Sequence, residues 1–196
     1  MKTKNTFIRL TAVAFVLAGG LPLTAVAGNT VEVHMRCAGS FMGPIFHVDA
    51  GGTTVSSGLL HQQCKGSLGR AELRGFGDQS EDPVFTLSCL GSSGTFLKFI
   101  VTETPLIFTF KGDLSLLFAN GSAEVCIDLA GGPTKIVGDI IFMGGRGRFE
   151  GATGFAVNEA EAKAVSTDGS FSGETSTIVG WISLPNDDDD SDSDSD

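Results

Sequence analysis

The sequence predicts an all-β fold, a single antiparallel barrel of about eight short strands. Polar and apolar residues alternate with a period of two over many segments, which is typical of strands with one buried face. The chain contains 27 glycines, 15 phenylalanines and no tyrosine, a composition that favours many turns around a phenylalanine-rich interior. No convincing long amphipathic helix interrupts the pattern, and short strands with frequent turn residues are typical of barrels and sandwiches. A closed barrel also leaves no sheet edge exposed.

The first 27 residues have the features of a secretory signal peptide. Lys2, Lys4 and Arg9 precede an apolar stretch over residues 10–23, and residues 25–27 (Ala-Val-Ala) supply the small side chains that a signal peptidase needs. The apolar stretch is short for a bilayer and contains glycine and proline, so a retained membrane anchor is the weaker alternative. We therefore expect cleavage after residue 27, secretion to a bacterial periplasm or the cell exterior, and no membrane span afterwards.

Residues 186–196 predict a disordered acidic tail. Seven of these eleven residues are aspartate and none is apolar, so the segment repels itself and has nothing to bury. Carboxylates attract Ca²⁺, but the tail lacks the turn glycine and the distant glutamate of an EF-hand loop. We expect weak, diffuse association with Ca²⁺ rather than a metal site.

Residues 28–185 remain as one domain of ordinary size. The net charge of the whole chain is −10, and it becomes −6 for this body without the three positive charges of the signal peptide and the seven tail aspartates. A mildly acidic body lacks the basic surface that nucleic acid or an anionic membrane requires. We therefore expect neither as a partner.

The four cysteines all lie in this body, and an even number in an exported protein favours disulfides. They are Cys37, Cys64, Cys89 and Cys126. Their spacings contain no C-x-x-C pair, so neither a zinc knuckle nor a thioredoxin-like site is indicated. Three pairings are open; neighbouring strands are often sequential, which favours Cys37–Cys64 with Cys89–Cys126.

The alternation predicts the strands in order along the chain. Over residues 30–37, Val31, Val33, Met35 and Cys37 share one face and the polar residues share the other. Further strands are predicted at residues 84–90, 95–102, 106–111, 114–119, 124–129, 136–143 and 175–184. Asn120-Gly121 predicts a hairpin turn between two of these strands, and residues 111–113 and 131–133 predict further breaks.

One segment, residues 158–165, contains good helix formers but also alternates. Charged residues occupy one parity, whereas Ala156, Ala160, Ala162 and Ala164 occupy the other. We favour a strand with a small-residue face over a helix.

A glycine-rich motif, G-G-R-G-R-F-E-G-A-T-G, covers residues 144–154. Its spacing fits neither a dinucleotide fingerprint nor a P-loop. We interpret its glycines as sites of positive φ or close backbone approach, with Phe149 as a plug at the barrel end. Arg146 and Arg148 would then be exposed or paired with Glu150. The residues that define the motif are Gly144, Gly145, Gly147, Arg148, Phe149, Gly151 and Gly154.

This motif resembles the G-G-x-G-R-F-x-G-A-T-G signature of secreted bacterial proteins related to the allene oxide cyclase and dirigent barrels. The resemblance is strongest over residues 134–155 and looser over the strand pattern of residues 84–182; a threonine is common in those proteins where Arg146 stands. It implies a barrel with a hydrophobic cavity and a possible homo-oligomer. Neither activity has a short motif that can be matched to this chain residue by residue, and a shared fold does not establish function.

Candidate catalytic residues are few. His34, His47 and His61 are scattered, there is no G-x-S-x-G elbow, and the charges between residues 70 and 78 predict a solvated hairpin. His61 could pair with Cys64 on a metal, but an oxidised Cys64 is lost as a ligand. Glu103, which ends an apolar strand, is the one weak candidate for a general acid or base. We expect no cofactor and no metal site.

The sequence therefore favours an exported, non-enzymatic barrel that binds a small apolar ligand or serves as an extracellular structural component. A cyclase or isomerase that shapes its substrate in a cavity is the first alternative. The second is Ca²⁺-responsive surface attachment through the acidic tail.

Overall fold

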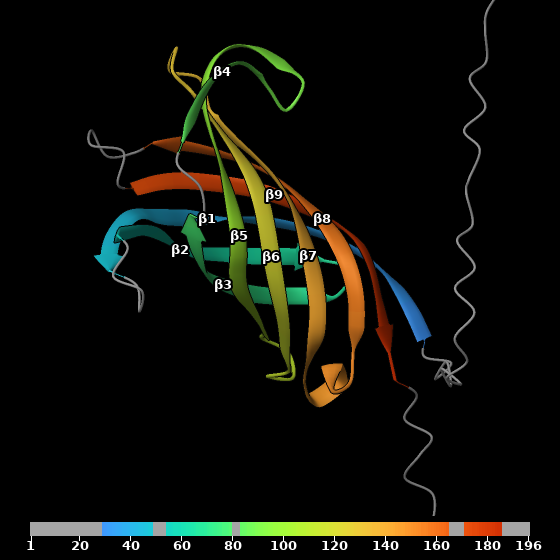
Figure 1. Ribbon diagram of the computed structural model, residues 1–196. Coiled ribbons are helices and arrows are strands. Elements are labelled where there is room, and N and C mark those ends of the chain that lie inside the picture. The colour runs from blue at the N-terminus through green and yellow to red at the C-terminus, as the bar shows by residue number, and fades with distance from the viewer. Residues whose placement is uncertain (1–28, 49–53, 80–82, 165–170, 186–196) are drawn as a thin grey trace, which may run out of the picture.

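The protein is a closed antiparallel barrel in the computed structural model, which describes residues 29–48, 54–79, 83–164 and 171–185 (Figure 1). Nine strands and one short 3₁₀ turn, η1, make up the secondary structure of these residues. They are β1 (Asn29–Val48), β2 (Thr54–Gly66), β3 (Gly69–Gln79), β4 (Val84–Cys89), β5 (Ser92–Phe110), β6 (Leu116–Asp128), β7 (Thr134–Arg146), η1 (Gly147–Phe149), β8 (Thr153–Ala164) and β9 (Phe171–Leu184). The predicted all-β barrel is confirmed.

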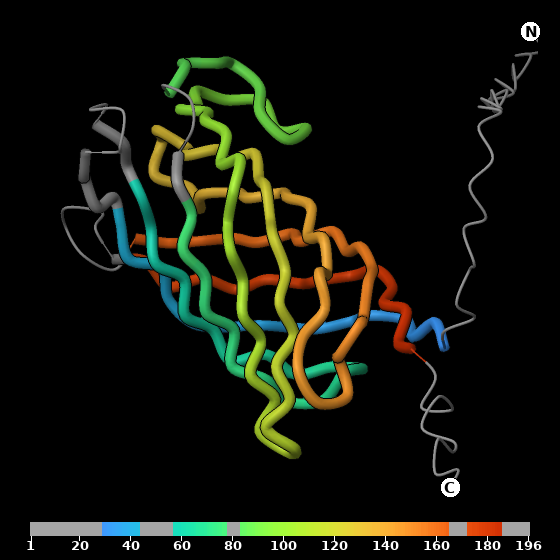
Figure 2. The backbone as a smooth tube through the Cα atoms, turned by 60° about the horizontal axis from the view of Figure 1, so that its bottom comes forward, coloured from blue at the N-terminus to red at the C-terminus, as the bar shows by residue number. Residues whose placement is uncertain are grey.

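The sheet has the strand order β3-β2-β1-β9-β8-β7-β6-β5-β4, and an additional pairing between β3 and β5 closes it. Eight strands therefore form the ring, and β4 lies outside it, paired with β5. Figures 1 and 2 show the β4 hairpin at one end of the barrel and η1 at the other. The upper part of β5 pairs with β4 and its lower part pairs with β3.

Side chains along each strand alternate between the inside and the outside of the barrel, and the inward-facing ones form its interior. In β1, Val33, Met35 and Cys37 are buried and face inward, while Glu32, His34 and Arg36 are exposed. In β8, the inward face is the alanine row and the outward face carries the charged residues. The strand prediction for residues 158–165 is therefore confirmed over the part that β8 covers.

The predicted turn at Asn120-Gly121 is wrong, because both residues lie inside β6 and pair with β5 on one side and β7 on the other. The Asn120 side chain instead accepts a hydrogen bond from the backbone N–H of Thr104, at 3.1 Å, where the register of β5 shifts. The predicted strands at residues 95–102 and 106–111 are thus one strand, β5, and those at 114–119 and 124–129 are one strand, β6. The breaks at residues 111–113 and 131–133 are confirmed.

Both favoured disulfides are present, Cys37–Cys64 and Cys89–Cys126. Cys37 and Cys64 are direct partners in the β1–β2 register and face the interior. The second disulfide connects the end of β4 to β6. The predicted signal peptide and acidic tail lie outside the described residues. Among the described residues, no helix is long and apolar enough to cross a membrane.

Candidate functional site

The glycine-rich motif closes one end of the barrel. Gly144, Gly147 and Gly151 have φ values of 99°, 65° and 68°, so the chain can fold back through η1 between β7 and β8. Phe149 in η1 is 1% exposed. Its ring lies 4.7 Å from that of Phe110, centroid to centroid.

Arg148 covers the Phe149 plug from the outer side. Its guanidinium lies 4.7 Å from the ring centroids of both Phe110 and Phe149. It donates a hydrogen bond to the carbonyl of Leu68 at 2.6 Å and pairs with Asp113 at 3.4 Å. Its carboxylate partner is therefore Asp113 and not Glu150. A hydrogen bond from the backbone N–H of Ser115, aided by the Arg148 charge, lowers the pKa of Asp113.

The interior near the plug is apolar; we call it the plugged half. Its inward-facing side chains are buried and belong to one continuous hydrophobic cluster. They include Val33, Met35, Leu73, Phe108, Phe110, Leu117, Phe142, Phe149, Ile178 and Ile182. Arg148 and Asp113 bond each other and their neighbours Leu68 and Ser115, so this end has the character of a structural seal.

The other part of the interior, which we call the polar half, surrounds Gln62, Asn158, Glu174 and Ser176. Its inward-facing neighbours are small, as in the alanine row of β8. Leu60, Val101, Ile136 and Asn158 face inward here and are half-buried.

A hydrogen-bonded chain of three buried side chains lies in the polar half. The Ser176 hydroxyl donates to Oε1 of Gln62 at 3.1 Å, and Nε2 of Gln62 donates to Oε1 of Glu174 at 2.9 Å. Gln62 and Glu174 come from β2 and β9, and Gly39 of β1 is the register partner of both. Because Gly39 has no side chain, Gln62 and Glu174 can meet across β1.

Glu174 is a buried carboxyl that has no counter-charge among the described residues. It is 6% exposed, and burial raises its pKa to about 7 even though the hydrogen bond from Gln62 acts in the opposite direction. Its inward-facing neighbours among the described residues are Gly39, Gln62, Ala162, Ser172 and Ser176; none of them is charged. A carboxyl with a pKa near neutrality can donate or accept a proton at physiological pH.

The side-chain amide of Asn158 is a second unusual group in the polar half. It faces inward from β8, between Ala156 and Ala160, and its Oδ1 atom is buried without a hydrogen-bond partner among the described residues. An unpaired buried acceptor costs about 1–3 kcal/mol. Native proteins usually pair such atoms, so this position calls for an explanation.

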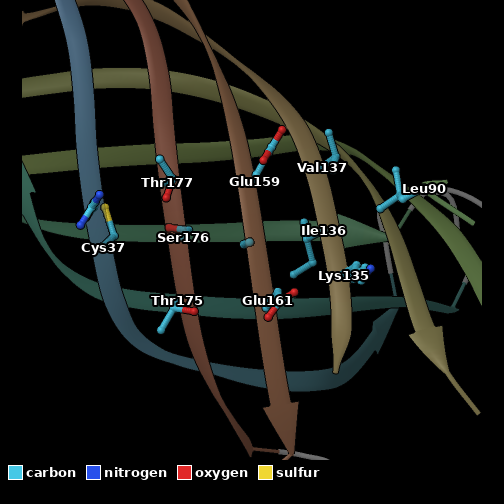
Figure 3. Close-up of a pocket in the computed structure, with 12 residues that line it drawn as sticks. Cys37, Leu90, Lys135, Ile136, Val137, Glu159, Glu161, Thr175, Ser176 and Thr177 are labelled. Carbon is cyan, nitrogen blue, oxygen red and sulfur yellow. The ribbon is translucent and has the colours of Figure 1, made fainter. Parts of the chain in front are cut away.

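A hollow of about 630 Å³ lies on the outer face of the barrel (Figure 3). Its walls include the outward-facing Arg36, Glu159, Glu161, Thr175 and Thr177. The β4–β5 hairpin contributes Leu90 at its edge. The groove is thus shaped by charged and hydroxyl side chains under the hairpin.

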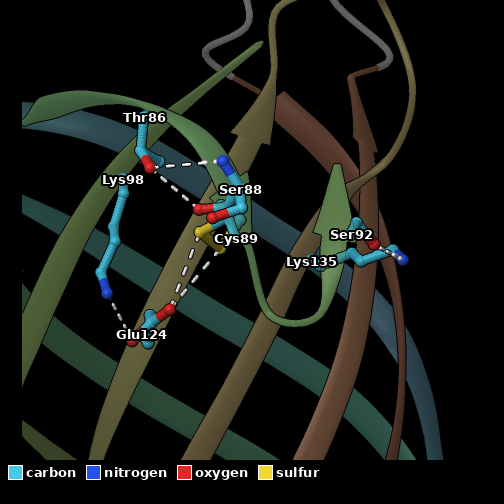
Figure 4. Close-up of a disulfide and its surroundings, with 8 residues drawn as sticks. Thr86, Ser88, Cys89, Ser92, Lys98, Glu124 and Lys135 are labelled. Carbon is cyan, nitrogen blue, oxygen red and sulfur yellow. Dashed lines mark hydrogen bonds and ion pairs between the residues drawn. A yellow bond between two sulfur atoms is a disulfide. The ribbon is translucent and has the colours of Figure 1, made fainter. Parts of the chain in front are cut away.

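The hairpin is fixed over β6 and β7 by two contacts (Figure 4). One is the Cys89–Cys126 disulfide, and the other is a 2.8 Å hydrogen bond from Nζ of Lys135 to the Ser92 hydroxyl. Glu124 lies 3.7 Å from the Cys89 sulfur and forms an ion pair with Lys98 at 2.8 Å. The two sulfurs and Glu124 are close enough to hold a metal, but sulfurs joined in a disulfide are not thiolate ligands.

The residues singled out in the sequence do not meet at one site. Glu103 is exposed on β5, opposite Asp78, and His34 is exposed on β1. His61 is exposed and lies 3.1 Å from Glu72, which also pairs with Arg74; these hydrogen bonds lower the pKa of Glu72, with the largest effect from Arg74. The side chain of His47 lies outside the described residues.

Gln62, Asn158 and Glu174 were not predicted as site residues from the sequence. Asn158 carried a usable signal, since it is the polar member of an otherwise small-residue row. Glu174 has the same parity as Ser176, Ile178 and Ile182, but the predicted last strand began one residue after it.

No protein-family model matches the sequence, and no curated protein matches it. Among solved structures, the chain is similar to the pterocarpan synthase dirigent protein GePTS1, with 12% sequence identity and a TM-score of 0.36. The match covers 88% of this chain and 99% of that chain. A similarity of this size carries no argument about function, so the assignment of a site depends on the geometry alone.

Proposed function

We propose that this protein is a non-catalytic binding barrel that holds a small, mainly apolar molecule in the polar half of its lumen. The observation that carries the proposal is the contrast between the two halves. One half is filled by its own side chains and sealed by Phe149. The other combines small inward-facing residues, half-buried side chains and a buried carboxyl that has no counter-charge in the described part of the chain.

The energetics support a binding role for the polar half. Burying an ionisable group and an unpaired amide oxygen destabilises a fold unless a partner compensates. Perturbed carboxyls in accessible interiors are more common at functional sites than elsewhere. A bound molecule would supply apolar contacts to the small residues and hydrogen bonds to the polar ones.

Native mass spectrometry tests this proposal. Protein purified from its own host's exported fraction should carry a small-molecule mass that is lost on denaturation. Ala160→Trp, which fills the lumen from β8, should abolish that mass. Glu161→Trp, on the outward face of the same strand, should retain it. A bare polypeptide that also fails to bind apolar dyes would overturn the proposal.

Glu174 supports a second candidate, a cyclase or isomerase that shapes its substrate and exchanges a proton with it. A pKa of about 7 is suited to general acid–base chemistry. In an assay that detects turnover of a bound compound, Glu174→Leu should lower the rate about 100-fold or more. An unchanged rate would show that Glu174 takes no part in turnover, and binding would then be the one function supported.

Two further proposals concern residues outside the lumen. The two disulfides are compatible with an extracellular protein, and we propose export through residues 1–27; N-terminal sequencing of the secreted form should begin at Gly28. We also retain the acidic tail as a candidate Ca²⁺-responsive attachment. Deleting residues 186–196 should then reduce surface retention in Ca²⁺.

A further inference from the structure

We infer that the hollow on the outer face of the barrel, which we call the outer groove, is a second binding site and takes a neutral oligosaccharide. The groove has a volume of about 630 Å³ and is bordered by the β4–β5 hairpin (Figure 3). It lies on the outer side of the barrel wall. This inference therefore concerns a different surface from the lumen and goes beyond the proposed function.

The strand register arranges the polar side chains of the groove in two parallel rows. The first row is Glu159 of β8, Thr177 of β9 and Arg36 of β1, and the second is Lys135 of β7, Glu161 of β8 and Thr175 of β9. Members of a row are register partners on neighbouring strands, so they lie about 5 Å apart. The two rows are two residues apart along each strand, which is roughly 7 Å. The floor of the groove is thus a regular array of polar groups.

These side chains offer both donors and acceptors of hydrogen bonds. The carboxylates of Glu159 and Glu161 accept, and the guanidinium of Arg36 donates. The hydroxyls of Thr175 and Thr177 do both. Within the described part of the chain, no hydrogen bond or ion pair occupies any of these five side chains. A ligand rich in hydroxyls matches this mixture, because each hydroxyl can donate and accept.

The charges along the groove balance. Glu159 and Glu161 supply negative charge, and Arg36 and Lys135 supply an equal positive charge. An anionic ligand would be repelled by the two carboxylates, and a cationic one by the two basic groups. The balance favours a ligand without net charge.

The hairpin supplies an apolar border. Leu90 and Gly91 form its two-residue turn, with φ values of 45° and 76°. Such turns favour Asn-Gly, and positive φ strains a leucine. The Leu90 side chain packs against Cys89 and Cys126 and borders the groove. With the half-buried Val137 of β7, it offers apolar surface to the C–H groups of a sugar ring.

The groove is formed before a ligand arrives. The Cys89–Cys126 disulfide and the hydrogen bond from Lys135 to Ser92 hold the hairpin over the wall. A fixed border lowers the ordering cost of binding. A volume of this size is also within the range of small-ligand sites.

Isothermal titration calorimetry with neutral tetrasaccharides tests the inference. The probes are cellotetraose, laminaritetraose, maltotetraose and N-acetylchitotetraose, and at least one should bind the native protein. Glu159→Gln should weaken that binding about tenfold, because a hydrogen bond to a charged acceptor is roughly twice as strong as one to a neutral acceptor. Glu32→Gln, on the outward face of β1 outside the groove, should bind like the native protein.

A second pair of variants removes a hydroxyl without changing side-chain shape. Thr177→Val should weaken the same tetrasaccharide about twofold to tenfold. Thr153→Val, on the outward face of β8 outside the groove, should have no effect. Circular dichroism of each variant separates loss of binding from loss of folding.

The hairpin provides an independent test. Changing Cys89 and Cys126 to serine releases the border and should weaken the tetrasaccharide at least about tenfold. Ala160→Trp, which fills the lumen, should leave its affinity unchanged. Unchanged affinity after release of the hairpin, or loss of binding in Ala160→Trp, would place the sugar elsewhere and overturn the inference.

Two further results would also overturn it. One is that none of the four tetrasaccharides binds the native protein at millimolar concentration. The other is that Ca²⁺ binds in their place and loses affinity in Glu159→Gln, which would assign the carboxylates to a cation. Neither result bears on the lumen ligand, so the proposed function would stand.

Discussion

The two halves of this barrel have the same backbone pattern but opposite interiors. In the plugged half, Phe110 and Phe149 fill the lumen and Arg148 covers their rings from outside. In the polar half, Gln62 and Glu174 occupy inward positions of the same strand system and meet across Gly39. One half supplies the packing free energy that lets the other carry groups that cost stability.

The largest expected effect comes from emptying the plugged half. Phe149→Ala should destabilise the protein by about 3–5 kcal/mol, because it removes a fully buried ring and leaves a cavity. Urea unfolding followed by circular dichroism measures this loss. Phe85→Ala is the control; that ring is 77% exposed and its removal should change stability by less than about 0.5 kcal/mol. Equal losses for both variants would show that Phe149 is not a packing residue.

Glu174 in the polar half should make the free energy of unfolding depend on pH. Burial raises the pKa of Glu174 from its ordinary value of 4.5 to about 7, so the unfolded chain releases this proton first as the pH rises. The contribution of Glu174 to the free energy of unfolding is therefore fully present below about pH 4.5. This contribution is lost, by roughly 3 kcal/mol in total, as the pH rises through about 7.

Glu174→Gln should remove this component. The free energy of unfolding, measured in urea at pH 5, 6, 7 and 8, should then fall less steeply for the variant than for the native protein. Parallel curves for the two proteins would mean that Glu174 titrates normally and that the polar half is open to bulk water.

A smaller effect should come from the close approach beside the plug. A Cβ atom at Gly145 would collide with the backbone carbonyl of Leu116, so Gly145→Ala should cost about 2 kcal/mol as β6 and β7 move apart. Gly112→Ala provides the control, since a Cβ there meets nothing within 4 Å. Thermal melts of both variants should separate them; an unchanged melting temperature for Gly145→Ala would contradict the tight contact.

The smallest effect on the barrel should come from releasing its hairpin. Changing Cys89 and Cys126 to serine should accelerate amide hydrogen exchange in β4 at least about tenfold and leave β1, β8 and β9 protected. Changing Cys37 and Cys64 should instead lower global stability by about 3 kcal/mol. A loss of global stability in the Cys89 and Cys126 variant would show that the hairpin is part of the barrel core.

Much of this fold could be predicted from local patterns, since alternation in β1 and β8 and the breaks after β5 and β6 depend on nearby residues. The turn at Asn120-Gly121 was wrong because Asn120 bonds Thr104 of β5, a long-range contact that overrides a local preference. β2 and β3 were not predicted as separate strands, because glycines take several positions on their inward faces and charged residues alternate along the outward face of β3.

The candidate site was harder to predict than the fold. Gln62 comes from β2, whereas Glu174 and Ser176 come from β9, and Gln62 and Glu174 are 112 positions apart in the sequence. Their meeting depends on the register of β1 with both neighbours and on the absence of a side chain at Gly39. Composition and spacing do not reveal such a register. The exposed Glu103 was a candidate only because it ends an apolar stretch of the sequence.

The direct pairing of β3 with β5 means that β4 is not required to complete the ring. The segment between them can therefore change in length or sequence while the circuit of backbone hydrogen bonds stays closed. Because Leu90 from this segment borders the outer groove, such changes would reshape a surface without rebuilding the core. The hairpin is thus the place where this barrel can acquire new specificity at the lowest structural risk.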